Sequence, residues 1–186
     1  MSEPVTAAKC GALLDALRVK KPLVHFITNY VTVNDCANIT LAVGGAPVMS
    51  DQPDDAAEIC RLASALVFNI GTPGDRTLEA MLRAGKAANE AGIPVVLDPV
   101  GAGASSFRNR LLEKLLEEVK FAAVKGNISE IRFLASGTGK SMGVDASKDD
   151  IALGSDSSAV ARLAAGLSRG IGAVVIVSGR IDVAAD

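Results

Sequence analysis

The 186-residue sequence predicts an α/β fold with a mainly parallel central sheet covered by helices on both faces. The first observation behind this prediction is that short apolar runs alternate six times with longer segments of helical periodicity. The second is that runs such as residues 94–97 are continuously apolar, which is typical of parallel strands buried on both faces. The third is that polar and glycine residues follow these runs, where α/β sheets bind their ligands.

Composition and charge exclude several classes of protein. Apolar residues make up 49% and charged residues 22%, as in globular proteins, and the length suits one domain with a sizeable core. The net charge of −2, with no basic block, disfavours nucleic acid and anionic membranes as partners. No run approaches the ~20 apolar residues of a membrane span, and the N-terminus lacks a signal-peptide pattern. We therefore expect a cytoplasmic protein.

Periodicity and turn residues divide the chain into elements. Strands are expected at residues 23–27, 46–49, 66–69, 94–97, 121–124 and 173–177, with an edge strand at 181–183. Helices are expected at residues 5–19, 32–43, 54–63, 75–91, 107–120 and 155–168, and from Ser129 onward. The polar, glycine-rich residues 136–150 are expected to form a surface excursion.

The three cysteines and the single histidine are expected to have structural roles. Cys10, Cys36 and Cys60 have no metal-site spacing and lie in helical apolar patterns, so we expect buried, reduced thiols. His25 interrupts an apolar strand, and a lone histidine in that position is expected to be a hydrogen-bonded core residue and not a catalyst.

Residues 93–103, IPVVLDPVGAG, form the stretch around which the rest of the chain is organised. Asp98 follows the apolar run, and the glycines at 101 and 103 allow backbone N–H groups to approach another group closely. A carboxylate beside a glycine-rich turn suggests a metal–phosphate site at the end of a strand. The alternative is an ordinary strand–helix turn in which Asp98 accepts hydrogen bonds from loop amides.

Two glycine-rich runs match known phosphate-binding motifs only in part. Residues 137–141, GTGKS, look like the end of a P-loop, but Leu134 stands where the first glycine belongs and no apolar strand precedes the run. Residues 101–106, GAGASS, resemble the dinucleotide-binding fingerprint. The next strand ends in Lys125 where that fingerprint expects an acid, which disfavours NAD and leaves NADP open.

Asp98, Lys125, Asn127 and Glu130 form a third constellation, because they follow two successive strands. Two carboxylates suit Mg²⁺ that bridges phosphates, and a lysine beside them suits a phosphoryl group. The alternatives are that Lys125 is a solvated strand end and that Glu130 is favoured by a helix N-terminus, with Ser129 as its cap.

Five runs in register resemble the hydroxyethylthiazole kinase family, a thiamine-salvage family of the ribokinase-like superfamily. These runs are residues 27–32, 45–49, 69–72, 98–103 and 125–131, and the resemblance extends over about residues 10 to 183. It implies a ribokinase-like fold, a single kinase domain over residues 1–186, and ATP-dependent, Mg²⁺-dependent phosphorylation of 4-methyl-5-(2-hydroxyethyl)thiazole. It also implies a homotrimer with active sites at subunit interfaces, which would give the amide-rich segment 28–40 a neighbour to face.

The resemblance carries over to individual positions. It implies that Met49, with Asn29 and Gly71 nearby, binds the thiazole substrate. Lys125 and Ser178 fall at positions that contact ATP, and we expect Asn127 beside them. Asp98 and Glu130 correspond to the acids near the metal and the phosphates.

One departure limits what the resemblance predicts. The family carries a later Gly-Thr-Gly-Cys segment that forms an anion hole and holds the residue nearest the substrate hydroxyl, and this sequence does not contain it. We therefore assign no catalytic residue, and we expect a fold incomplete at the C-terminus, a fragment or truncated product, and impaired transfer. Two alternatives stay open: another ribokinase-like kinase for a small vitamin precursor, or a catalytically dead module that binds thiazole or nucleotide.

Overall fold

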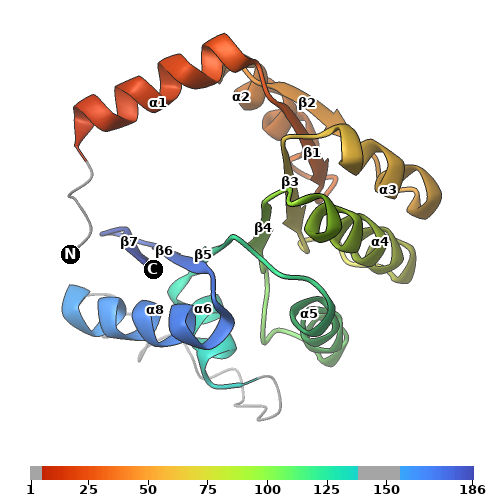
Figure 1. Ribbon diagram of the computed structural model, residues 1–186. Coiled ribbons are helices and arrows are strands. Elements are labelled where there is room, and N and C mark those ends of the chain that lie inside the picture. The colour runs from red at the N-terminus through yellow and green to blue at the C-terminus, as the bar shows by residue number, and fades with distance from the viewer. Residues whose placement is uncertain (1–5, 138–155) are drawn as a thin grey trace.

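The computed structural model describes residues 6–137 and 156–186, which form a seven-stranded sheet in the order β2-β1-β3-β4-β5-β6-β7 (Figure 1). Adjacent strands pair in parallel throughout, except that β7 pairs antiparallel with β6. The strands are β1 (Leu23–Ile27), β2 (Ala46–Met49), β3 (Ala65–Asn69), β4 (Val95–Asp98), β5 (Ala123–Asn127), β6 (Val174–Ser178) and β7 (Val183–Ala185). The predicted α/β fold with a mainly parallel sheet is confirmed.

The order of the strands decides where the helices lie. The chain moves outward from β1 to β2, then reverses past β1 to β3 and continues in that direction to β6. Because parallel crossovers are right-handed, the reversal places α2 on the opposite face of the sheet from the later helices. The described helices are α1 (Ala7–Lys20), α2 (Val33–Val43), α3 (Pro53–Leu62), α4 (Asp75–Ala91), α5 (Ser106–Glu118), α6 (Ile128–Ala135) and α8 (Ser157–Ile171).

The face of the sheet beneath α3, α4, α5, α6 and α8 is the main core, and we call it the covered face. Its side chains alternate along each strand and are almost fully buried: His25, Ile27, Leu66, Phe68, Val95, Leu97, Val124, Val175 and Val177. Small residues let the helices approach this layer closely. A Cβ added at Gly85 of α4 would lie 2.6 Å from the Val119 side chain, so only glycine fits there.

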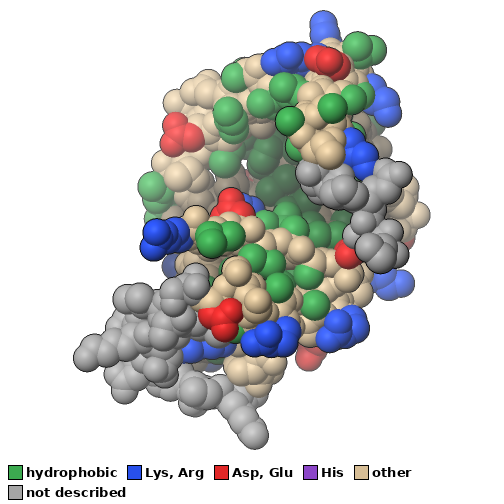
Figure 2. All heavy atoms as spheres, turned by 90° about the vertical axis from the view of Figure 1, so that its left-hand side faces the viewer, with side chains coloured by type: hydrophobic (Ala, Val, Ile, Leu, Met, Phe, Trp, Pro, Cys, Tyr) green, Lys and Arg blue, Asp and Glu red, His purple; other side chains and the backbone are tan. Residues whose placement is uncertain are grey.

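The other face of β3–β6 is much less covered by the described helices, and we call it the open face. Its strand residues are half-buried or exposed: Val67, Asn69, Val96, Asp98, Ala123, Lys125, Asn127, Val174, Ile176 and Ser178. Figure 2 shows a hollow on this side of the molecule, with hydrophobic side chains deep inside it. Helices therefore lie on both sides of the sheet as predicted, but α2 covers only the edge formed by β1 and β2.

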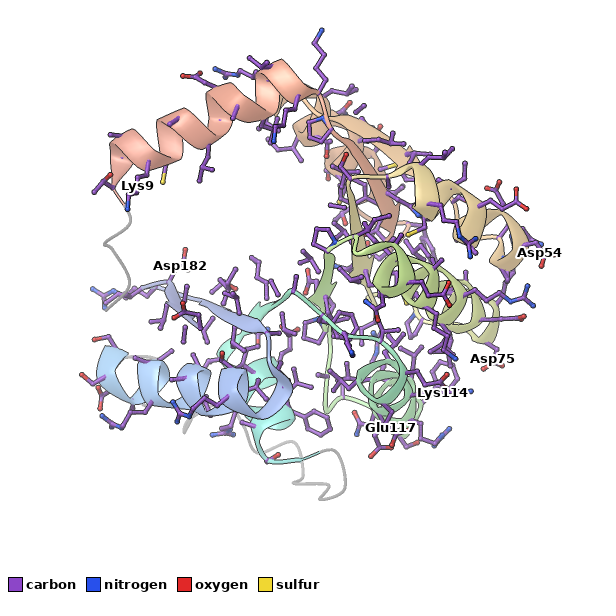
Figure 3. All side chains as sticks on the ribbon, in the orientation of Figure 1. Lys9, Asp54, Asp75, Lys114, Glu117 and Asp182 are labelled. Atoms are coloured by element: carbon purple, nitrogen blue, oxygen red, sulfur yellow. The ribbon has the colours of Figure 1, made fainter. Side chains whose placement is uncertain are left out.

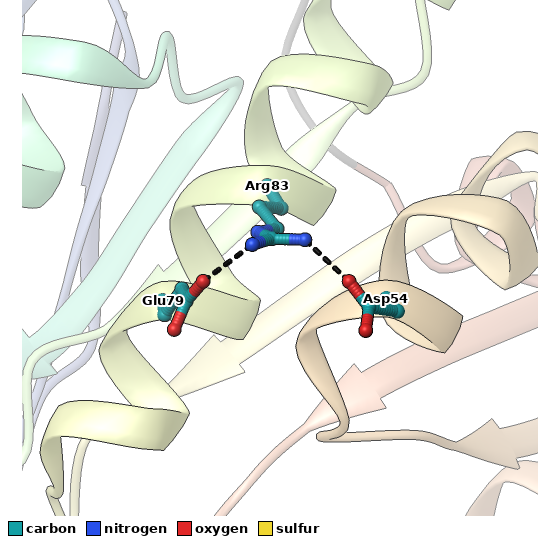
Figure 4. Close-up of polar contacts among 3 residues, drawn as sticks. All are labelled: Asp54, Glu79 and Arg83. Atoms are coloured by element: carbon teal, nitrogen blue, oxygen red, sulfur yellow. Dashed lines mark hydrogen bonds and ion pairs between the residues drawn. The ribbon is translucent and has the colours of Figure 1, made fainter.

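Charged residues occupy the outer side of the helix layer. Figure 3 shows Asp54, Asp75, Lys114 and Glu117 at the outer edges of α3, α4 and α5, away from the sheet. Arg83 connects α4 to α3, because its guanidinium donates to Asp54 of α3 at 2.5 Å and to Glu79 of α4 at 2.6 Å (Figure 4).

The N-terminal helix α1 departs from the sequence prediction. Cys10 was expected to be buried, but it is exposed, and Leu13 and Val19 on the same helix are 71% and 83% exposed. The helix contacts α2, yet none of its residues is buried, so its apolar pattern has little to pack against. Cys36 is only half-buried, whereas Cys60 is buried as predicted, and burial raises the pKa of its thiol to about 11.

Most predicted element boundaries are confirmed to within two residues, but α8 ends three residues later than predicted, and so does β5. Strand β5 begins at Ala123 because pairing with β4 begins there, and it extends to Asn127 opposite Ser178. Residues 138–141 of the glycine-rich run GTGKS, and all but two residues of the expected excursion 136–150, lie outside the described residues. Within the part of the chain that is described, no helix is long and apolar enough to cross a membrane.

Candidate functional site

The reversal of strand order between β1 and β3 defines the position of the candidate site. In open parallel sheets, ligands bind outside the carboxyl ends of the strands at such a switch point. The loops that leave β1 and β3 here are joined by a hydrogen bond from Asn29 Nδ2 to Asn69 Oδ1 at 3.0 Å. Strand order and loop chemistry therefore indicate the same place.

A cavity of about 480 Å³ opens beside the switch point, and we call it the switch-point cavity. Its walls combine apolar side chains, hydroxyl groups and one ion pair, and they come from the ends of β1 and β2, the loop after β3 and the first turns of α2 and α4. The lining residues are Phe26, Thr28, Tyr30, Val33, Met49, Ser50, Asp51, Thr72, Arg76 and Thr77. The volume and mixed lining suit a small organic molecule.

Of the three predicted substrate residues, only Met49 is among the residues that line this cavity. Met49 lines it directly, whereas Asn29 is 92% buried beneath the loop that carries Tyr30. Asn29 Oδ1 accepts hydrogen bonds from the backbone N–H groups of Val31 and Thr32, each at 3.0 Å, which fixes that loop. A Cβ added at Gly71 would lie 2.9 Å from Asn69 Oδ1 and 3.1 Å from Asn29 Cβ, so the close packing here needs glycine.

Asp98 and Lys125 lie next to each other on the open face, at the ends of β4 and β5. Burial raises the pKa of Asp98, and the Glu130 carboxylate raises it further. The Lys125 ammonium and a hydrogen bond from Asn69 Nδ2 at 2.9 Å act in the opposite direction. A partly buried carboxylate beside a second acid would gain from a cation bound between them.

Glu130 has a defined role in the fold besides its predicted role at the metal. Its two oxygens accept from the backbone N–H groups of Gly101, at 2.9 Å, and Asn127, at 2.8 Å. Asn127 in turn caps α6 by accepting from Glu130 N, which completes a capping box. The cap of this helix is therefore Asn127, and not Ser129 as in the alternative that the sequence left open.

The same contacts bear on the second interpretation of the glycine turn, in which Asp98 accepts hydrogen bonds from loop amides. A carboxylate does satisfy a loop amide there, but the acceptor is Glu130 and not Asp98. The N–H of Gly103 donates to Asn109 Oδ1 at 2.9 Å. Because both glycine N–H groups are used within the chain, the run 101–106 does not offer them to a dinucleotide phosphate.

The predicted nucleotide-contacting residues occupy the far end of the same edge. Ser178 stands opposite Asn127 in the register of β5 and β6, and its hydroxyl donates to Gly126 O at 3.2 Å. Lys125 and Asn127 are exposed on the open face. Met49 is level with Val96 across three strand spacings, two residues before Asp98. At about 4.8 Å per strand and about 3.3 Å per residue, roughly 16 Å separates Met49 from Asp98.

Two residues that connect the site are absent from the sequence-based assignment. Asn69 contacts both Asn29 and Asp98. Its position at the end of a buried strand is the feature of the sequence that could have indicated it. Arg108 donates to the carbonyl groups of Ile70, Val100 and Gly71 at 2.6, 3.0 and 2.9 Å, so it ties the loops after β3 and β4 together. No local pattern in the sequence predicts three carbonyl partners for Arg108.

Asp98 and Glu130 could together hold a divalent cation. Their oxygens are hard ligands, and Mg²⁺ is commonly bound through one or two carboxylates together with substrate phosphates. The pKa of Asp98 is raised by burial first and by the nearby Glu130 carboxylate second. Among the described residues, no group of three or more His, Cys, Asp or Glu side chains could hold a metal ion. The donor set present therefore fits a cation shared with a phosphate ligand.

His25 is buried as predicted, and it supports the wall of the cavity from the covered face. Its Nε2 lies 2.9 Å from Ser50 O, while Nδ1 has no partner among the described residues. Burial lowers the pKa of His25, although the Ser50 contact and the charge of Asp55 oppose the shift. A neutral ring that donates from Nε2 fits these surroundings.

The fold and the site define an α/β protein that presents a small-molecule cavity and an acidic pair along the carboxyl ends of one parallel sheet. Residues 14–186 match the model of the hydroxyethylthiazole kinase family. Hydroxyethylthiazole kinases of Clostridium beijerinckii and Desulfovibrio desulfuricans are 51% and 54% identical, over 96% and 93% of this chain. The chain belongs to the hydroxyethylthiazole kinase family.

A solved structure supports the same assignment. The hydroxyethylthiazole kinase protein of Pyrococcus horikoshii superposes with a TM-score of 0.80 at 35% identity, over 93% of this chain and 61% of that one. The predicted membership of the family and the ribokinase-like fold are thereby confirmed. The chain spans 64% and 61% of the lengths of the Clostridium and Desulfovibrio relatives.

Proposed function

We propose that this chain provides the fold and ligand sites of an ATP-dependent hydroxyethylthiazole kinase. The enzyme would transfer a phosphoryl group to the hydroxyethyl arm of 4-methyl-5-(2-hydroxyethyl)thiazole in thiamine biosynthesis. The observation that carries this proposal is the switch-point cavity beside Met49, with the acidic pair Asp98 and Glu130 on the same sheet edge. Family membership supports the choice of substrate.

We assign the thiazole ring to the switch-point cavity. Met49 and Phe26 would contact the apolar ring, and Asn29 and Gly71 would hold the cavity wall behind it. This position directs the hydroxyethyl arm along the strand ends toward Asp98, where the phosphoryl group would arrive. Phosphoryl transfer depends mainly on such positioning and on electrostatic stabilisation.

We assign the nucleotide to the open face at β4–β6. Lys125 would hold phosphate charge, and Asn127 and Ser178 would contact the nucleotide after exchanging their present hydrogen bonds. Asp98 and Glu130 would hold Mg²⁺, and that ion would neutralise charge on the phosphates. The Asn69 amide orients Asp98, and the backbone N–H of Gly101 orients Glu130.

We further propose a homotrimer with active sites at subunit interfaces, located in the cytoplasm, in which residues 1–186 form a single kinase domain. Large apolar side chains are exposed around the cavity and on α2: Tyr30, Val31, Ile39 and Leu41 are 79%, 75%, 62% and 59% exposed. Exposed apolar residues grouped in this way mark interaction surfaces. A neighbouring subunit would bury them and complete the cavity.

Calorimetric titration of the chain with thiazole alcohol, and separately with MgADP, tests this proposal. We expect both ligands to bind, and Met49→Ala to weaken thiazole binding about tenfold because buried apolar contact is lost. Leu62→Ala is the matched control, because Leu62 is 72% exposed and outside the cavity lining. Thiazole-dependent formation of ADP from ATP tests the transfer itself. Absence of thiazole binding, or equal binding by the Met49 and Leu62 variants, would contradict the proposal.

A further inference from the structure

Asn69 stands between the two halves of the site. It is the last residue of β3, its Cα partner in the neighbouring strand is Asp98, and β1 with Asn29 lies on its other side. Its side chain contacts Asn29, which lies beneath the loop at the cavity, and Asp98 of the acidic pair. Among the side chains that the structure describes at this edge, it alone hydrogen-bonds to both Asn29 and Asp98.

The hydrogen bonds fix which way the Asn69 amide points. The backbone N–H of Gly71 can only donate, and it donates to one terminal atom of Asn69 at 2.9 Å, so that atom is the oxygen. Asn29 Nδ2 donates to the same oxygen at 3.0 Å. The other terminal atom is therefore the nitrogen, and it must donate to Asp98 Oδ2 at 2.9 Å.

The surrounding packing holds this arrangement in place. A Cβ at residue 71 would lie 2.9 Å from Asn69 Oδ1, so the oxygen occupies space that only a glycine leaves. The Oδ1 atom of Asn29 in turn accepts hydrogen bonds from Val31 N and Thr32 N. A continuous chain of hydrogen bonds thus runs from the loop at the cavity, through Asn29 and Asn69, to one oxygen of Asp98.

We propose that Asn69 is a positioning residue that fixes Asp98 in one rotamer relative to Asn29 and the loop that Asn29 holds beside the cavity. This inference rests on the proposed kinase function, because it sets where a substrate hydroxyl held in the cavity lies relative to the acid. The alternative is a purely structural Asn69 that only stabilises the turn from Asn69 to Gly71 through its oxygen.

Two substitutions separate these roles. Asn69→Asp keeps an oxygen for Gly71 N and Asn29 but loses the N–H that binds Asp98. Asn69→Leu loses all three hydrogen bonds. Asn89 is the matched control, because its amide also bridges two groups, Lys120 O at 2.9 Å and Lys120 N at 2.8 Å, away from the site. Asn89→Asp and Asn89→Leu are therefore made in parallel.

The first readout is the χ1 rotamer of Asp98, from side-chain coupling constants or from crystal structures of the full chain. We expect one rotamer in the unmodified chain and in both Asn89 variants, and a mixture or a changed rotamer in both Asn69 variants. The second readout is thiazole-alcohol affinity, which we expect to fall about tenfold in Asn69→Leu and to stay within about threefold in Asn69→Asp, because only the former loses the Asn29 contact.

A single unchanged Asp98 rotamer in the Asn69 variants would overturn the proposal. Changes of affinity and rotamer that are proportional to the loss of melting temperature across all four variants would also overturn it. Asn69→Asp keeps the test decisive if the leucine variant does not fold. If the unmodified chain neither binds thiazole alcohol nor forms ADP, the kinase proposal fails, and the Asp98 rotamer still decides the positioning role. Where ADP does form, we expect kcat to fall about 10–100-fold in both Asn69 variants, as for other residues that orient ligands of a metal.

Discussion

The two faces of the sheet in this protein differ in what they contribute. On the covered face, Leu66, Phe68, Leu97 and Val124 are fully buried under helices. On the open face, their immediate neighbours in sequence are half-buried or exposed and include Asn69, Asp98 and Lys125. Since side chains of one strand alternate between the faces, the same strands supply both the core and the site. Residues that build the core therefore alternate, one by one along each strand, with residues that face the site.

The largest expected effect comes from the covered face. Phe68 packs edge-to-face against Phe121 with ring centroids 6.3 Å apart, and it is fully buried. We expect Phe68→Ala to lower the free energy of unfolding by about 3–5 kcal/mol, because it removes buried surface and leaves a cavity. Val67→Ala, next to it on the open face, is expected to cost about 1 kcal/mol or less. Urea denaturation measures both, and equal losses would contradict the comparison of the faces.

The next expected effect is a pH dependence that arises on the covered face. His25 is the only histidine, and burial lowers its pKa in the folded state below the 6.5 of an unperturbed ring. The unfolded chain therefore binds the proton more readily, so stability is lost as the pH falls below about 6.5. Other groups that face the ring are Ser50 O and the Asp55 carboxylate, which only reduce the shift.

His25→Gln tests the origin of this pH dependence. Glutamine can still donate toward Ser50 O but does not titrate. We expect the loss of urea resistance between pH 7.5 and 5.5 to be smaller in the variant than in the unmodified chain. An unchanged loss would show that other groups, and not the buried ring, cause the acid sensitivity.

A smaller effect is expected at the edge of the open face, where hydrogen bonds and not burial stabilise the chain. Asn127→Ala removes the N-cap of α6 and half of its capping box, which should cost about 1 kcal/mol in urea denaturation. Thr6, whose side chain caps α1, is the matched control. Because α1 buries none of its residues, we expect Thr6→Ala to leave the global midpoint unchanged. Equal shifts would mean that α1 unfolds together with the sheet.

The smallest effect is expected in the outer helix layer. Arg83→Ala breaks the contacts with Asp54 and Glu79, whose side chains are 81% and 52% exposed. Water and salt already screen such pairs, so we expect no resolvable shift of the urea midpoint at physiological ionic strength. A clear destabilisation that disappears at high salt would show that the ion pair fixes α3 against α4 more strongly than its exposure suggests.

Sequence patterns predicted the fold well and the contacts within the site less well. Continuous apolar runs such as residues 94–97 predicted the parallel strands, because burial on both faces leaves a local signature. The polar residues after them predicted the edge that carries the site. The prediction that Cys10 is buried was wrong. An apolar periodicity predicts a helix, but it does not specify whether another element packs against that helix.

The strands, the helices, the family and the polar residues at the carboxyl ends of the strands can all be recognised from the amino-acid sequence. Three contacts become visible only in the folded chain: Glu130 with Gly101, Arg108 with two loops, and Asn69 with both Asn29 and Asp98. These partners are 29 to 40 residues apart in the chain. Their contacts depend on strand order and on the reversal between β1 and β3, which no local pattern of residues specifies.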